Sequence, residues 1–419
     1  MLGQSWRAGH DHFGLSAGTA GNPRPGYGRT TNNEGKKTLT YRSSRLVRLG
    51  LAGAVALALT QVSVPSAHAQ DSGPITFGFF GPLSGKFSAN GERFKEAVEL
   101  FAETTNANGG IGGRDLVILQ EDDRGDPLQS AAIAQKYSEN EDVVTAIGSF
   151  TSSASIAAGE IFADVGLPQV SPSSSHPDFT KISNFQFRIP NTQETMSLKY
   201  VETLKANAPH DKVAVIYFQD DWGIFVGNAT KAALEEGGSE VPIFEAMSPD
   251  GRDFRPLVTK LRSADVDSIL LASHYGPSSI FLQQLRQAGL DQQVVGPETL
   301  YNPELIELAG DAANGLITTT YFFPSDPTKQ DFVKLYSEKY GRDPDLWAAY
   351  AWDAVAIAGE AAKALVEAGE PVTRAAMRDA IDGLPPFDGV TGVTEFVDGT
   401  PQKDLTILAI EDGAYKLHE

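Results

Sequence analysis

Short runs of hydrophobic residues alternate with longer segments of helical periodicity along most of this chain. Residues 75–80 form one such run and predict a buried strand. A helix is predicted from Glu92, because hydrophobic residues from Phe94 to Phe101 recur at the i, i+3, i+4, i+7 spacing of one helical face. The alternation continues with strands expected at 116–119, 143–148 and 168–171, and with helices expected at 129–140 and from Ser153. Repeated strand–helix–strand units predict an α/β fold with a parallel sheet and helices on both of its faces.

The same pattern restarts in the second half of the chain, which suggests a second, similar lobe. Strands are expected at 213–217, 241–244, 269–271 and 294–295, and helices from about Gly223, at 254–261 and at 277–288. Beyond Thr318 the pattern changes, and two helices are predicted at 330–340 and 346–368. These two helices are too hydrophobic to stand alone.

Residues 46–69 match a secretory signal peptide. An uncharged stretch rich in Leu, Ala and Val at 49–64 follows several arginines, and Ala67-His68-Ala69 fits a small-x-small cleavage site. The mature chain is therefore expected to begin at Gln70. A membrane anchor is the alternative, but the hydrophobic stretch is shorter than the ~20 residues that a span needs. Residues 1–41 are either an over-extended start or a tail without structure.

Length and charge narrow the class of protein. A mature chain of this size is longer than one hydrophobic core usually holds, so two domains are expected. Residues 1–69 hold eight Lys and Arg and two Asp and Glu, so their removal changes the formal net charge from −20 to −26. Such a charge repels nucleic acid and anionic lipid. The chain has no cysteine, which excludes disulfides, thiolate metal sites and a lipid-modified N-terminal Cys. A soluble protein of a bacterial periplasm fits best.

Small hydroxyl residues follow two of the predicted strands in the first half. Ligands of open parallel sheets bind beyond the carboxyl ends of the strands, where loops lead into helices. Gly148–Ser153 is one such segment, and Ser152 and Ser153 lie where a helix N-terminus would add backbone N–H groups and its positive dipole end. Ser173, Ser174 and Ser175 follow the next strand. Together they could hold an anion, although each serine alone could equally serve as a helix cap or turn residue.

An acid and two aromatic residues follow strands of the second half. Glu298 could pair with an ammonium, Tyr275 could add a hydroxyl or a ring face, and Trp222 could cover a hydrophobic side chain. Glu298 could instead cap a loop, and Trp222 could belong to the core. With the serines, these residues suit a zwitterion that carries a carboxylate and an ammonium, which describes an amino acid. Asp122, Asp123 and Asp126 are interpreted as a solvated turn rather than a metal site.

These residues, in this order, resemble the leucine/isoleucine/valine-binding protein family, the type I periplasmic solute-binding proteins of ABC importers. The resemblance covers essentially all of residues 71–419, and the ordered set of motifs is specific although no single one is decisive. The matching motifs are Gly81-Pro82-Leu83-Ser84-Gly85, Asn106-Ala107-Asn108-Gly109-Gly110-Ile111-Gly112-Gly113, Asp122-Asp123 with Asp126-Pro127, Ser171-Pro172 with Pro177 and Thr180, Asp253-Phe254, Leu285-Arg286-Gln287-Ala288-Gly289-Leu290, and Tyr350 with Asp353-Ala354-Val355.

The resemblance implies two doubly wound parallel-sheet lobes joined by several hinge crossovers. The N-terminal extension and signal peptide occupy 1–69. Lobe 1 is expected to comprise 70–190 and 323–398, and lobe 2 to comprise 191–322 and 399–419. The helices beyond Thr318 are therefore expected to pack on lobe 1, and the last strands, near 391–411, to cross back.

The resemblance also implies roles for the candidate residues. Positions matching Ser152 and Ser173–Ser175 hold the ligand carboxylate, the one matching Glu298 holds the ammonium, and Tyr275 and Trp222 match aromatic ligand contacts. Asn90 departs from the pattern, since an aromatic residue often stands there and helps to form the side-chain pocket. Specificity for leucine, isoleucine or valine is therefore open. Relatives bind amides, urea, polar amino acids or aromatic acids, and Phe150 with Trp222 would tolerate an aromatic ligand.

Three classes of function follow. The first is the soluble binding component of an ABC transporter, expected as a monomer, that captures an amino acid and delivers it to a permease in the inner membrane. The second is an enzyme, which is disfavoured because the chain lacks both a phosphate-binding loop and a Gly-x-Ser-x-Gly elbow. The third is a sensor that reports ligand occupancy to a receptor. No cofactor, metal or nucleic acid partner is expected.

Overall fold

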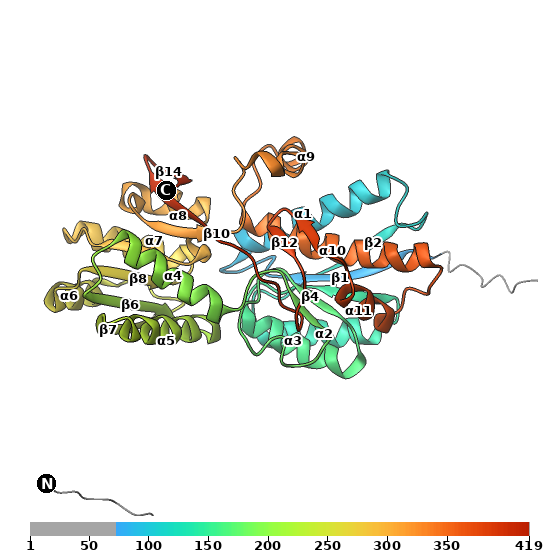
Figure 1. Ribbon diagram of the computed structural model, residues 1–419, viewed down its shortest axis with the longest axis horizontal. Helices are drawn as coiled ribbons and strands as arrows, with labels where there is room; N and C mark the ends of the chain where they lie inside the picture. Colours follow the sequence, from blue (N-terminus) through green and yellow to red (C-terminus); the bar gives the residue numbers. More distant parts are fainter. Residues whose placement is uncertain (1–72, 419) are drawn as a thin grey trace, which may run out of the picture. The chain divides into compact units, whose positions relative to one another are not determined.

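The computed structural model describes residues 73–418, and the predicted signal peptide at 46–69 lies outside them. The first half of the described chain forms a five-stranded parallel sheet (Figure 1). Its strand order is β2 (Leu116–Asp122), β1 (Ile75–Gly81), β3 (Val143–Ile147), β4 (Gln169–Ser171) and β5 (Gln186–Arg188). The prediction of a parallel sheet is confirmed for this half of the chain.

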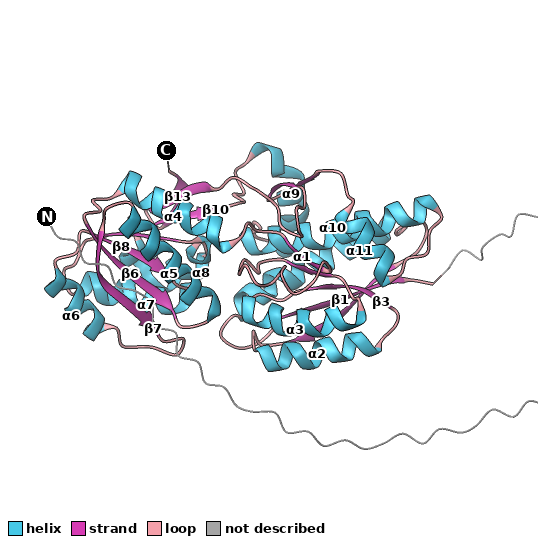
Figure 2. Cartoon of the chain, turned by 60° about the horizontal axis from the view of Figure 1, so that its bottom comes forward, coloured by secondary structure: helices cyan, strands magenta, loops and turns pink. Residues whose placement is uncertain are grey.

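Helices cover both faces of the five-stranded sheet (Figure 2). They are α1 (Ser88–Ala107), α2 (Pro127–Glu139), α3 (Ser152–Val165), α10 (Leu346–Ala368) and α11 (Arg374–Asp382). Successive side chains of a strand point to opposite faces. Phe79 accordingly shares a core with Phe94 of α1, whereas the next residue, Phe80, packs edge-on against Tyr137 of α2 and Phe162 of α3. Strands buried on both faces explain the continuous hydrophobic runs in the sequence.

A seven-stranded sheet contains the strands of the second half. Its order is β14 (Ala414–Leu417), β13 (Thr406–Glu411), β10 (Ile317–Thr320), β9 (Gln293–Gly296), β8 (Ser268–Ala272), β6 (Lys212–Phe218) and β7 (Glu240–Met247). The five strands from β10 to β7 are parallel, but β13 and β14 pair antiparallel at the edge. Asp412 and Gly413 both have positive φ and make the two-residue turn between them. The sheet is therefore mixed rather than wholly parallel.

Helices also cover both faces of the seven-stranded sheet. Val215 of β6 shares a core with residues of α4 (Gln193–Asn207) and α5 (Asp221–Glu236). The next residue, Ile216, belongs to the core formed with the helices of the other face. Those helices are α6 (Arg255–Ala264), α7 (Tyr275–Gln287) and α8 (Pro303–Ala309). The remaining elements are the short helices η1 (Glu298–Leu300), η2 (Gly310–Ala313) and η3 (Pro327–Lys329), helix α9 (Gln330–Tyr340), and a hairpin of β11 (Phe387–Gly389) and β12 (Gly392–Thr394).

The chain passes between the two sheets at three places. It leaves the first sheet after β5, returns between β10 and α10, and leaves again between β12 and β13. Two of these crossings are bonded to each other. The side chain of Asn191 accepts a hydrogen bond from the backbone N–H of Lys403 and donates one to its carbonyl, each at 2.7 Å. The exact lobe boundaries stay a prediction, while the two-sheet α/β architecture is confirmed.

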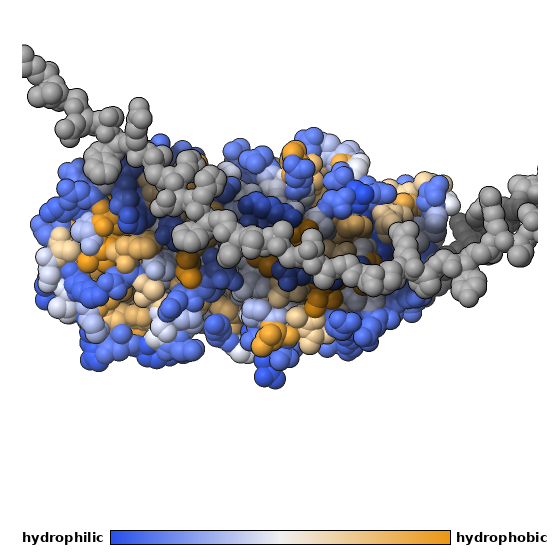
Figure 3. Space-filling model, turned by 90° about the horizontal axis from the view of Figure 1, so that it is seen from below, coloured by the Kyte–Doolittle hydropathy of each residue, from blue (hydrophilic) through white to orange (hydrophobic). Residues whose placement is uncertain are grey.

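Residues 73–418 contain no helix that is long and hydrophobic enough to cross a membrane. On the face shown in Figure 3, hydrophobic patches alternate with hydrophilic ones. Large hydrophobic side chains that are exposed come from separate elements, among them Leu128 of α2, Leu198 of α4 and Leu308 of α8.

Candidate ligand-binding site

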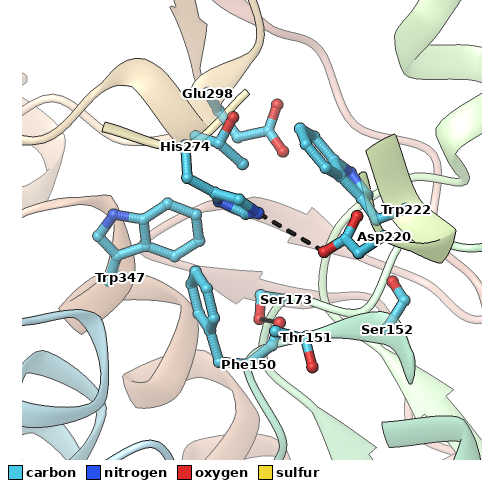
Figure 4. A pocket seen from close by; sticks show the side chains of 10 residues that line it. Phe150, Thr151, Ser152, Ser173, Asp220, Trp222, His274, Glu298 and Trp347 are labelled. Carbon is cyan, nitrogen blue, oxygen red and sulfur yellow. Dashed lines mark hydrogen bonds and ion pairs between the residues drawn. The ribbon is translucent and has the colours of Figure 1, made fainter. Parts of the chain in front are cut away.

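Side chains from loops and helices on the sides of both sheets line one cavity of about 320 Å³ (Figure 4). The lining residues are Phe150, Thr151, Ser152, Ser173, Asp220, Trp222, His274, Glu298, Thr299 and Trp347. The loops after β3 and β4 contribute four of them, and the loops after β6, β8 and β9 contribute most of the others. The cavity therefore lies at the carboxyl ends of parallel strands, where the sequence placed the candidate residues.

The wall from the first sheet is rich in hydrogen-bond donors. Thr151 caps α3, and its hydroxyl oxygen accepts a hydrogen bond from the backbone N–H of Ala154 at 3.3 Å. The N–H groups of Ser152 and Ser153 come before the first intrahelical bond, so the helix itself provides no acceptor for them. Ser152 Oγ accepts a hydrogen bond from the N–H of His176 at 3.3 Å. Its own hydroxyl proton has no acceptor among residues 73–418 and remains available to a ligand.

A glycine shapes the loop that leads to this wall. Gly148 follows β3 with φ +144°, a backbone conformation that L side chains rarely adopt. A Cβ atom at this position would lie 2.2 Å from the carbonyl oxygen of Phe80. The loop can therefore approach β1 this closely only with glycine at this position.

The serines after β4 have different roles. Ser173 lines the cavity, but its hydroxyl donates to the carbonyl oxygen of Phe150 at 2.7 Å. Ser175 does not line the cavity, and its hydroxyl donates to Gln193 Oε1 at 2.6 Å. The same oxygen accepts a hydrogen bond from the indole N–H of Trp222 at 2.8 Å. Ser175 thus positions Trp222 through Gln193 at the start of α4.

Glu298 supplies the acid of the opposite wall. Its side chain is buried, and Tyr200 Oη donates a hydrogen bond to Oε2 at 2.5 Å. Burial raises the pKa of Glu298 to about 7, although the hydrogen bond from Tyr200 lowers it. Tyr321 and Tyr350 are buried near this carboxylate, and burial together with its charge raises the pKa of both phenols well above the usual value. Within residues 73–418 no cation pairs with this carboxylate, so it favours one brought by a ligand.

Aromatic rings surround the cavity and connect the two sheets. Phe150 contacts Trp347 of α10 with ring centroids 5.1 Å apart, and it contacts His274 at 5.8 Å. Phe87, which precedes α1, contacts His274 at 5.0 Å and Phe218 of β6 at 6.4 Å. The contacts of Phe87 and Phe150 with His274, and of Phe87 with Phe218, join the sides of different sheets, so side chains from both sides meet around the cavity.

Five of the ten predicted binding residues line the cavity together: Phe150, Ser152, Ser173, Trp222 and Glu298. Ser153 is half-buried beside Ser152 on α3, and Ser174 is buried with a hydroxyl oxygen that has no partner among the described residues. Tyr275 lines a different hollow, together with Lys86 and Pro277. Asn90 is buried on α1 and does not line the cavity.

The sequence-based prediction missed five lining residues: Thr151, Asp220, His274, Thr299 and Trp347. Asp220 and His274 are each the second residue after a strand, β6 and β8, so the strand-end rule that selected their neighbours could have found them. Trp347 comes from the first turn of α10, and no local signal marks it as a cavity residue. Tyr200, which bonds Glu298, also lies within a helix and carries no signal of its own.

The two sides of the cavity present hydrogen-bonding groups of opposite character. No group of three or more His, Cys, Asp or Glu that could hold a metal ion occurs within residues 73–418. The first sheet presents hydroxyl and N–H donors, and the second presents a carboxylate. Such a pair of walls matches a small molecule with an anionic and a cationic end.

Two α/β sheets with helices on both faces, three connections and a cavity between strand ends define a two-lobed ligand-binding protein. Residues 74–414 match the family model described as periplasmic binding protein. The chain belongs to this family, so it is a substrate-binding protein and not an enzyme, and its type I fold is the one that the sequence predicted.

Known relatives share this architecture. A leucine-, isoleucine-, valine-, threonine- and alanine-binding protein of Pseudomonas aeruginosa is 28% identical over 311 residues, which cover 73% of this chain and 81% of the relative. A Rhodospirillum rubrum structure, provisionally assigned to a branched-chain amino acid ABC transporter, is 35% identical with a TM-score of 0.63, covering 82% of this chain and all of that one. An ABC transporter substrate-binding protein of Desulfitobacterium hafniense in complex with Leu is 25% identical with a TM-score of 0.69, at the same coverage.

Proposed function

We propose that this protein captures a free amino acid in the cavity between its two sheets and delivers it to the permease of an ABC transporter. One observation carries the proposal: Ser152, at the N-terminus of α3, and the buried carboxylate of Glu298 line the same small cavity from different sheets. A ligand with a carboxylate and an ammonium on one carbon can contact both walls at once.

The ligand carboxylate lies, in this proposal, against the N-terminus of α3. It accepts hydrogen bonds from the Ser152 hydroxyl and from the N–H groups of Ser152 and Ser153, where the helix dipole adds to the attraction. Charge-assisted hydrogen bonds contribute on the order of 1.5–3 kcal/mol each. Three of them are enough to fix the orientation of a small anion.

The ligand ammonium pairs with Glu298. A buried carboxylate with a pKa of about 7 is only partly ionised at neutral pH. An ammonium beside it favours the ionised form and lowers the pKa of Glu298. In the ligand-free protein the ionised carboxylate is buried without a cation, which is unfavourable, and a bound ammonium compensates this buried charge. Only an ammonium-bearing ligand removes this cost.

Delivery to a permease is supported by two relatives: one is described as an ABC transporter substrate-binding protein, and the other is provisionally assigned to a branched-chain amino acid ABC transporter. We infer that the mature protein is periplasmic and monomeric and begins near Gln70, after cleavage of the signal peptide.

The ring contacts of Phe87 and Phe150 with His274 support capture by closure of the two lobes, since a ligand that touches both walls stabilises the closed state.

Isothermal titration calorimetry with the twenty common amino acids tests the proposal. We expect at least one of them to bind with a Kd near or below the micromolar range, and both Ser152→Ala and Glu298→Gln to weaken binding at least tenfold. Glu307→Gln, an exposed acid on α8, is the matched control and should leave the Kd unchanged. Silence across all twenty amino acids, or a Glu298→Gln protein that binds as well as the original, contradicts the proposal.

An aromatic acid is the second candidate, because Phe150, Trp222, His274 and Trp347 all line the cavity. Its carboxylate would use the same serine wall, and its ring would lie among these aromatic side chains. Glu298 would then have no cation to pair with, so Glu298→Gln would not weaken binding. Titration with benzoate separates this candidate from the first. Amides and urea are further alternatives, which the same titrations with urea and acetamide would detect. A sensor would use the same cavity, so it is distinguished from a carrier by its protein partner and not by its ligand.

A further inference from the structure

His274 is the most unusual residue of the cavity. The residue is 6% exposed, and its ring lies among aromatic rings, with centroids 4.7 Å from Phe218, 5.0 Å from Phe87 and 5.0 Å from Trp222. Its Nε2 atom is buried and has no hydrogen-bond partner within residues 73–418. A buried polar atom without a partner is costly, and it is rare in native proteins. His274 therefore faces the cavity with an unused hydrogen-bonding atom (Figure 4).

Asp220 lies across from this atom. Its Oδ1 caps α5 by accepting a hydrogen bond from the backbone N–H of Gly223 at 2.8 Å. Its Oδ2 lies 3.9 Å from His274 Nε2, which is too far for a direct hydrogen bond. Both residues line the cavity, so this long pair, drawn as a dashed line in Figure 4, borders the space that a ligand would fill.

We propose that the ligand is an amino acid whose side chain carries a hydroxyl or a primary amide, and that this polar group binds between His274 and Asp220. This inference rests on the proposed function. An oxygen or nitrogen atom can lie about 2.8 Å from both Nε2 and Oδ2, because those atoms are 3.9 Å apart. A hydroxyl can accept from the imidazole N–H and donate to the carboxylate at the same time, and a primary amide offers the same two functions.

A branched aliphatic side chain fits this part of the cavity poorly. It would cover Nε2 of His274 and Oδ2 of Asp220 with carbon atoms and leave both without a partner. A site built to hydrogen-bond a polar group rejects the analogue that lacks it far more strongly than a hydrophobic pocket rejects an added methylene. His274 and Asp220 are thus specificity-determining residues, whereas Ser152 and Glu298 hold groups that all amino acids share.

Two pairs of amino acids of nearly equal shape test the proposal by calorimetry: threonine against valine, and asparagine against leucine. In at least one pair we expect the polar member to bind at least tenfold more tightly. His274→Phe keeps an aromatic ring in the cluster but removes Nε2, and Asp220→Ser keeps a capping oxygen for α5 but removes the carboxylate. Either variant should bring the affinity ratio of that pair close to one, with thermal melting used to confirm folding.

Several outcomes would overturn the inference. The first is equal or tighter binding of valine and leucine, which means that a water molecule, or nothing, occupies the space between the two residues. A second is a polar preference that persists in both variants, because other residues would then determine it. Binding only of common amino acids that lack a side-chain hydroxyl or primary amide overturns the inference alone. Silence across all twenty contradicts the proposed function as well, so the two failures are distinguishable.

Discussion

Arg93 of α1 and Glu304 of α8 form an ion pair between helices that pack on different sheets, with Nη2 3.3 Å from Oε1. Arg93 also lies 3.4 Å from Asp345 Oδ2 and 3.7 Å from Glu96 Oε2, both of which belong to the side of the first sheet. Burial opposes the charge of the guanidinium, but the nearby acids together raise the pKa of Arg93. Of the three acids around Arg93, only Glu304 belongs to a helix that packs on the second sheet.

The first prediction concerns closure. Glu304→Gln removes a contact between helices of different sheets, while Arg93 keeps Asp345 and Glu96 as partners. Because a partly exposed pair contributes about 1 kcal/mol or less, we expect the Kd of the bound amino acid to rise two- to fivefold. Calorimetry on the variant and on Glu307→Gln measures the difference, and an equal Kd for both would show that the pair plays no part in closure.

The second prediction separates two predicted ligand serines. The Ser152 hydroxyl faces the cavity, whereas the Ser175 hydroxyl donates to Gln193 and supports Trp222. Ser152→Ala should therefore weaken ligand binding at least tenfold, and Ser175→Ala by less than about fivefold. Kd values from calorimetry give the comparison. A larger loss with Ser175→Ala would mean that Ser175 turns toward the ligand when it binds.

The third prediction concerns ligand binding at different pH. Glu298 has a raised pKa of about 7, and only its ionised form attracts an ammonium. Amino acid affinity should therefore fall as the pH drops from 8 to 6. Tyr200→Phe removes a hydrogen bond that lowers this pKa, so the decline should begin at a higher pH in the variant. A pH profile of Kd that is identical in both proteins would contradict this role of Tyr200.

The fourth prediction concerns the stability of the ligand-free protein. The pKa of Glu298 is raised by folding from 4.5 to about 7, so the folded state binds more protons than the unfolded state within this interval. The stability that the folded protein gains by keeping Glu298 protonated is fully present below pH 4.5 and is lost as the pH rises through 7. It amounts to about 3 kcal/mol, from 1.36 kcal/mol per pKa unit.

Glu298→Gln has no charge to bury and should lack this part of the pH dependence. Asp345, whose pKa burial raises to about 6, and Asp353 and Asp123, whose pKa values burial also raises, act in the same direction in both proteins. The difference between the two proteins in free energy of unfolding, measured by denaturant titration from pH 4.5 to 8, isolates Glu298. Parallel profiles would mean that Glu298 is not buried in solution.

Much of the fold could be read from hydrophobic periodicity. The helices predicted at 330–340 and 346–368 coincide with α9 and α10, because each has an amphipathic or strongly hydrophobic pattern with clear ends. Helix α4 and the short strand β5 were not predicted. Helix α4 has polar residues spread around it, and β5 has only three residues, so neither carries a strong period. The antiparallel edge strands β13 and β14 also lay beyond what periodicity could assign.

The sequence by itself determined which residues lie at strand ends, because alternation of hydrophobic runs and helices sets where each loop begins. That was enough to predict Ser152, Ser173, Trp222 and Glu298 as neighbours of one ligand. Only the tertiary structure decided which hydroxyl faces the cavity, that Ser175 instead supports Trp222, and that Trp347 and Tyr200 reach the site from helices. The hydrogen bonds behind these relationships join residues 18 to 98 positions apart in the chain, and local patterns contain no information on how such segments come together.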